Sequence, residues 1–200
     1  MQADWEVEIG PEAPAIDASW PGFIDLRRDL AQVAEIEETQ KFPALTEALL
    51  QLNNPGPDCD AAGAAPRLPV WTAKCDLWVL EPGMEQWDPD EMDAIHAESA
   101  AGLACYIDLL PWMGLVFAGL DEAEAWARAI VSRLKEAACR CCRADLVIRR
   151  AFNRDAEGLG VTAYISACGA DSDGAKEALS AALLSVVDAI GATTCPAKKS

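Results

Sequence analysis

The chain has little basic charge, a single histidine and only two tyrosines among its 200 residues. Lys and Arg number 16 against 33 Asp and Glu, which gives a formal net charge of −17. Nucleic-acid binding requires clustered cations that neutralise phosphates, and an anionic membrane surface attracts a protein in the same way. We therefore expect neither a nucleic-acid partner nor a membrane partner. The acidity itself is explained either by a solubilising surface or by a docking site for a basic protein.

Several nucleotide-binding and catalytic motifs are missing as well. The sequence has no G-x-S-x-G, no G-K-[ST] and no G-x-G-x-x-G, and so lacks a nucleophile elbow, a P-loop and a dinucleotide fingerprint. The only histidine, His96, lies in an acidic segment, where an exposed or capping role is expected rather than catalysis. These absences favour a binding, assembly or regulatory protein over an enzyme, and they imply no cofactor.

No long hydrophobic run has the form of a membrane span. Residues 100–120 contain one charge, but that charge, Asp108, and Pro111 lie near the middle, and the flanks are acidic. A buried strand followed by a loop explains this stretch better. The first residues, 1–6, have neither the basic nor the apolar region of a secretory signal, so we expect a cytoplasmic protein.

The chain has 8 cysteines, which in a cytoplasmic protein are expected to be reduced thiols. Cys139, Cys141 and Cys142 form a cluster in which Cys139 and Cys142 have C-x-x-C spacing. This cluster is a candidate redox or metal site, although it follows a helix instead of opening one, and a zinc site would need further ligands. Structural thiols are the alternative.

Hydrophobic periodicity predicts one domain over residues 1–200, with an extended N-terminal arm at 1–21 and a short flexible tail at 192–200. Apolar residues at helical spacing predict helices at 43–53, 121–138 and 174–190, and a further one at 29–40. The acidic residues from Asp88 onward resemble a calcium loop, but a helix N-cap followed by proline explains them better.

Five segments have the alternating pattern of strands: 22–28, 70–80, 103–110, 144–152 and 160–168. The first four share an Asp-Leu step inside an apolar run. A strand, a helical stretch and a second strand occupy 22–80 and again 103–152. We infer a duplicated β-α-β unit.

Side chains alternate between the two faces of a strand, so that these patterns assign every residue to a face. One face is apolar and is expected beneath the helices. The other carries aromatic and charged side chains. A sheet with helices on one face predicts an α+β fold, a two-layer sandwich with a mostly antiparallel sheet, of which the ferredoxin-like arrangement is the common case.

The polar face is the candidate functional surface, because aromatic rings beside charges suit recognition. Its candidate ligand-binding residues are Asp25, Arg27, Asp76, Trp78, Tyr106, Asp108, Asp145, Arg149 and Tyr164. We expect it to bind a protein partner, a second copy of the chain or a small ligand. The alternatives are a solvated face of ion pairs, a metal-dependent enzyme built on the four aspartates, and a redox or metal protein working through the cysteine cluster.

Overall fold

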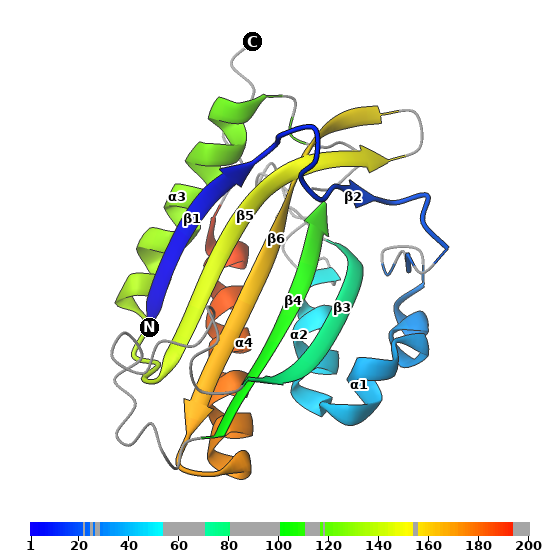
Figure 1. The fold of residues 1–200 in the computed structure, drawn as a ribbon. Helices are drawn as coiled ribbons and strands as arrows, with labels where there is room; N and C mark the ends of the chain where they lie inside the picture. Colours follow the sequence, from blue (N-terminus) through cyan, green and yellow to red (C-terminus); the bar gives the residue numbers. More distant parts are fainter. Residues whose placement is uncertain are drawn as a thin grey trace, which may run out of the picture.

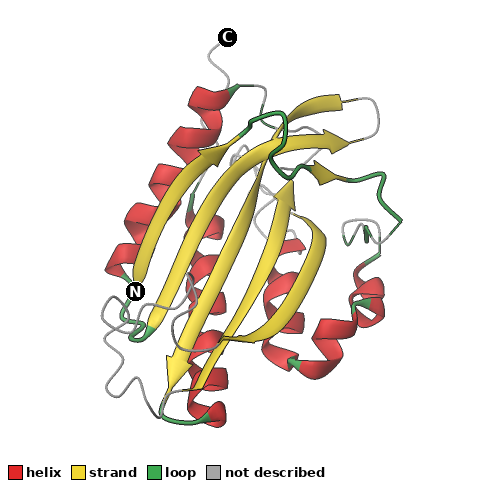
Figure 2. Ribbon diagram, viewed as in Figure 1, coloured by secondary structure: helices red, strands yellow, loops and turns green. Residues whose placement is uncertain are grey.

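The computed structural model describes residues 1–21, 23–24, 26, 29–53, 71–80, 101–110, 117, 119–153 and 156–193, and of 71–80, 153 and 156 it describes the backbone alone. These residues form a sheet with α2, α3 and α4 packed against one of its faces (Figures 1 and 2). The predicted α+β class is confirmed. None of the helices in this part of the chain has both the length and the apolar character that crossing a bilayer requires.

The strands are β1 (Gln2–Glu8), β2 (Ile16–Asp17), β3 (Trp71–Leu80), β4 (Ala101–Leu110), β5 (Cys142–Asn153) and β6 (Ala156–Gly169). The helices are η1 (Leu30–Glu35, a 3-10 helix), α1 (Glu37–Lys41), α2 (Pro43–Asn53), α3 (Leu120–Glu136) and α4 (Ser172–Ala192). The helices predicted at 43–53, 121–138 and 174–190 and the last four predicted strands are thus found close to their expected bounds. The helix predicted at 29–40 is instead a 3-10 helix and a short α-helix, separated by the extended backbone of Ile36.

The strand order is β1-β5-β6-β4-β3, with β2 beside β5. Antiparallel pairing joins β3 to β4, β4 to β6 and β6 to β5, whereas β1 and β2 run parallel to β5. Since β4 and β5 are both antiparallel to β6, the segment β4-α3-β5 is a parallel crossover with β6 inserted between its strands. The β-α-β unit predicted at 103–152 is therefore present.

Two predictions about the N-terminal third were wrong. Residues 2–8, predicted as part of an extended arm, form edge strand β1. Their alternation explains the difference, because Ala3 and Trp5 pack on the core while Asp4 and Glu6, which alternate with them, line a hollow on the other face. The strand predicted at 22–28 is also missing where it is described: positions 23, 24 and 26 form loop and turn. The first β-α-β unit, 22–80, has no opening strand there.

The predicted division of the sheet into two faces is confirmed for β4, β5 and β6. The side chains predicted to face the helices are almost fully buried: Cys105, Ile107, Leu109, Leu146, Ile148, Val161, Ala163 and Ile165. They pack against the buried faces of α3 and α4, which carry Trp126, Ile130, Leu134, Leu179, Leu183 and Val186. The intervening residues of the three strands lie on the face without helices, which we call the open face.

Some predictions lie outside the described residues. They are the cap at Asp88, the role of His96, and positions 194–200 of the tail. The predicted start of the tail, residue 192, is too early, because Ala192 is the last residue of α4 and Thr193 is buried.

Gly169 provides a test of how closely β6 and α4 pack. A Cβ at this position would lie 2.5 Å from the amide nitrogen of Ala175 and still closer to the carbonyl carbon of Gly174. Backbone atoms cannot move aside as a flexible side chain can, so Gly169→Ala should lower the free energy of unfolding by about 1–3 kcal/mol in a urea titration.

Gly191→Ala is the matched control. This glycine lies in the last turns of α4, and a Cβ there would meet nothing within 4 Å. Because alanine restricts the unfolded chain and favours helix, the control should leave the stability unchanged or raise it by roughly 0.4–1 kcal/mol. Equal effects of the two substitutions would contradict the packing described for Gly169.

Candidate functional site

The centre of the open face is a pair of tyrosines, the only two in the chain. Tyr106 on β4 and Tyr164 on β6 are directly opposite in the antiparallel register, and their ring centroids are 5.8 Å apart. Both rings remain partly exposed. Aromatic pairs at this separation stabilise each other and present a continuous apolar area for contact.

Arg149 lies against this pair and is held in place from two sides. Its guanidinium carbon is 5.5 Å from the centroid of the Tyr164 ring. Its Nη2 and Nε donate to Glu8 Oε2 at 2.7 and 3.1 Å. Burial would lower the pKa of Arg149, but Tyr164 and Glu8 outweigh burial and hold that pKa above its usual value. The positive charge is therefore fixed in position, with its side chain 13% exposed.

Asp108 and Asp145, two of the predicted acids, lie on the open face but do not come together. The buried hydroxyl of Thr162 donates to Asp108 Oδ1 at 2.5 Å. Arg143 Nε donates to Asp145 Oδ2 at 2.7 Å. Because β6 separates the strands that carry the two acids, they do not form the predicted carboxylate cluster.

The other predicted residues are placed only in part. Asp25 and Arg27 lie outside the described residues. Asp76 and Trp78 lie on β3, whose backbone register sets them opposite Tyr106 and Ala104.

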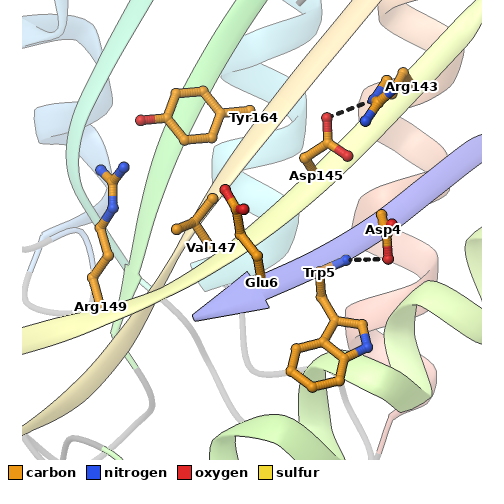
Figure 3. A pocket seen from close by; sticks show the side chains of 8 residues that line it. All are labelled: Asp4, Trp5, Glu6, Arg143, Asp145, Val147, Arg149 and Tyr164. Atoms are coloured by element: carbon orange, nitrogen blue, oxygen red, sulfur yellow. Dashed lines mark hydrogen bonds and ion pairs between the residues drawn. The ribbon is translucent and has the colours of Figure 1, made fainter. Parts of the chain in front are cut away.

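A first hollow of about 370 Å³ opens beside Tyr164 (Figure 3). Its lining comes from β1, β5 and β6 and consists of Asp4, Trp5, Glu6, Arg143, Asp145, Val147, Arg149 and Tyr164. The parallel pairing of β1 with β5 sets Asp4 opposite Asp145, so that two like charges are neighbours. In Figure 3 the Glu6 carboxylate extends toward Val147 and Tyr164, while the Trp5 ring points away toward α3.

A second hollow of about 490 Å³ adjoins the first and shares Arg149 and Tyr164 with it. Its other lining residues are Pro14, Ala15, Ile16, Asp17, Trp20, Tyr106 and Asp108. The N-terminal segment forms one wall because β2 pairs with β5 and the Ala18 amide donates to Phe152 O at 2.8 Å. Trp20, at 50% exposure, is the most exposed large apolar residue in the described part of the chain.

The cysteine cluster lies apart from this surface, between the end of α3 and the start of β5. The Sγ atoms of Cys139 and Cys142 are 2.7 Å apart. Cys141, at φ 55°, has a left-handed backbone, and its carbonyl accepts from the Cys168 amide at 2.9 Å. Within the described residues no group of three or more His, Cys, Asp or Glu side chains is arranged to hold a metal ion.

The two thiols of the C-x-x-C pair differ in acidity. Their mutual hydrogen bond lowers the pKa of Cys139 to about 7, although burial opposes this shift. The same hydrogen bond, together with burial, raises the pKa of Cys142. Burial, with the nearby Cys141, raises the pKa of Cys168 to about 12, and burial alone raises that of Cys105 to about 12.

Sequence analysis missed the acidic row of β1. Asp4, Glu6 and Glu8 fall within the predicted arm, yet Asp4 and Glu6 line the first hollow and Glu8 is the partner of Arg149. The alternation of acids with Ala3, Trp5 and Val7 predicts a half-buried strand and was available in the sequence. That this strand adds to β5 depended on the tertiary structure.

No family model matches the chain, and no curated protein and no solved structure resembles it significantly.

The acidity of Cys139 has a measurable consequence. At pH 7 about half of this thiol should be thiolate, the form that reacts with iodoacetamide, so Cys139 should be alkylated at least about tenfold faster than Cys105 or Cys168. Peptide mapping by mass spectrometry after short labelling times gives the three rates separately.

Cys142→Ala removes the hydrogen bond that lowers this pKa. It should therefore slow the alkylation of Cys139 at pH 7, whereas Cys168→Ser should leave the rate unchanged. An unaltered rate in Cys142→Ala would show that the acidity of Cys139 has another origin.

Proposed function

We propose that the protein is a non-enzymatic cytoplasmic binding module whose open face takes a small apolar organic cation. The observation that carries the proposal is the pair of adjoining hollows that meet at Arg149 and Tyr164. Ligand sites commonly occupy about 300–1,000 Å³ and combine aromatic walls with a few polar groups of fixed position. Both hollows fall within that range.

A purely solvated face of ion pairs explains the site less well. Exposed ion pairs contribute only about 0–1 kcal/mol each, which does not account for two tyrosines and Trp20 gathered beside them. Apolar area of this kind on a surface is typical of a contact site. The charged groups are also held by neighbours, since Glu8 fixes Arg149 and Thr162 fixes Asp108. Such preorganisation suits recognition.

Charge favours a cation as the ligand. Arg149 and Arg143 are engaged by Glu8 and Asp145, and the first hollow holds two further carboxylates, Asp4 and Glu6. Tyrosine faces attract positive groups, and a chain of net charge −17 raises the local concentration of cations.

We also propose that the sheet is related to the ferredoxin-like fold. The run β4-α3-β5-β6-α4 has the split β-α-β-β-α order of a ferredoxin-like fold, and β3 occupies the edge beside β4 that the final strand fills in that fold. We interpret the sheet as a rearranged ferredoxin-like sheet. Among the described elements, α2-β3-β4 and α3-β5-β6 share one order, so a duplicated helix–hairpin unit replaces the duplicated β-α-β unit in this interpretation.

Tetraphenylphosphonium and tetraphenylborate, which have the same shape and opposite charge, test the proposal by calorimetry on the reduced protein. The cation should bind and the anion should not. Tyr164→Leu removes a cation–π contact and Glu6→Gln removes a negative charge from the hollow. Each should weaken binding of the cation about three- to fivefold, or about 0.6–1 kcal/mol.

Glu136→Gln is the matched control for charge. Glu136 is exposed at the end of α3, so this substitution removes the same charge on the opposite side of the sheet. It should leave the affinity unchanged. Equal binding of both ions, or equal loss in all three variants, would refute a specific cation site. If neither ion binds and Tyr164→Leu instead alters the oligomeric mass, the open face is an interface between protein chains.

A further inference from the structure

The connection between α3 and β5 places two thiols in contact at the end of the sheet where β5 begins, whereas β2 pairs with the other end of β5 (Figure 1). Cys139 follows the last turn of α3 and Cys142 is the first residue of β5. Their Sγ atoms, 2.7 Å apart, are close enough to form a bond with little movement of the backbone. This geometry is independent of the open face.

The two thiols are unequal in exposure as well as in acidity. Cys139 is half-buried, whereas Cys142 is 2% exposed. Cys142 Sγ also lies 3.1 Å from Arg140 O and 3.3 Å from Ala178 O on α4. An accessible thiol with a buried partner is the arrangement in which one sulfur attacks an external disulfide and the other completes the exchange.

The backbone of the connection holds this arrangement. Cys142 is paired with Ala167 in the β5–β6 register, and the Cys168 amide donates to Cys141 O. The positive φ of Cys141 is uncommon for a residue with a side chain. A β-carbon in this backbone conformation is disfavoured, and such positions persist where the surrounding structure fixes them. The turn at Cys141 lets Cys139 and Cys142 meet.

We propose that Cys139 and Cys142 form a redox-active dithiol that exchanges with small disulfides of the glutathione type. The Cys139 thiolate attacks one sulfur of the external disulfide, which forms a mixed disulfide and releases one thiolate. Cys142 then loses its proton and attacks Cys139 Sγ, which releases the second thiolate. The protein dithiol gives up two electrons and two protons, and the external disulfide is reduced to two thiols.

Redox titration of the full chain in mixtures of oxidised and reduced glutathione tests this proposal. After acid quenching and alkylation, trypsin should release residues 136–140 joined to residues 141–143 by a disulfide. The linked peptides should form and disappear reversibly as the glutathione ratio changes. Absence of the linkage in fully oxidised glutathione would overturn the proposal.

Variants separate Cys142 from Cys141, which lies on the same tryptic peptide. Cys141→Ser should retain the linkage, and Cys142→Ser and Cys142→Ala should both abolish it. In the two Cys142 variants a glutathione adduct should accumulate on Cys139, because the resolving thiol is missing. In Cys139→Ser no adduct should form on the buried Cys142. Loss of the linkage in Cys141→Ser, with its retention in the Cys142 variants, would assign the bond to Cys141 and refute the proposed pair.

Cys168→Ser is the matched control, since Cys168 contacts the connection without belonging to the pair, and it should retain the linkage. Circular dichroism verifies that every variant folds. Because Cys142→Ser and Cys142→Ala are both prepared, the prediction is still tested if one of the two variants does not fold. Cation binding at the open face should be retained in Cys139→Ser, so that the two proposals are tested separately.

Discussion

The alternation of side chains along β4, β5 and β6 is the constraint on which the rest of the structure depends. Apolar residues of these strands are buried against α3 and α4, which fixes the register of the sheet. A shift by one residue would carry the whole apolar set to the other face, at a cost far larger than any ion pair could offset. Tyr106, Asp108, Asp145, Arg149 and Tyr164 therefore lie on the open face as a consequence of core packing.

The first hollow of the open face exists because β1 is added to the sheet. Without β1 the sheet would end at β5, and Arg149 would lack Glu8, its closest carboxylate partner. Parallel pairing places the acids of β1 level with Asp145 and Arg149, which forms the wall of the first hollow. Residues 14–17 and Trp20, which follow β1, form a wall of the second hollow. The N-terminal segment thus supplies charged groups to the first hollow and a wall to the second.

A different constraint shapes the turn between α3 and β5, which carries the cysteine cluster. Its sulfur atoms meet because α3 must return to the start of β5 through a short turn, and that turn passes through Cys141 in a left-handed conformation. The hydrogen bond between Cys139 and Cys142 makes one thiol more acidic at the expense of the other. The chemistry of this pair follows from the crossover, while that of the open face follows from the strand alternation.

The sequence by itself determined the elements whose patterns are long and regular. Apolar periodicity predicts helices α2, α3 and α4, four strands and the division of the sheet into two faces. It does so because burial of one apolar face stabilises each of these elements. Only the tertiary structure decided which strands are neighbours. It separated Asp108 from Asp145 by inserting β6, placed residues 2–8 in the sheet, and set Glu8 beside Arg149 across 141 positions of the chain. Strand order depends on contacts between distant segments, and the local pattern of a segment carries no information about its partner.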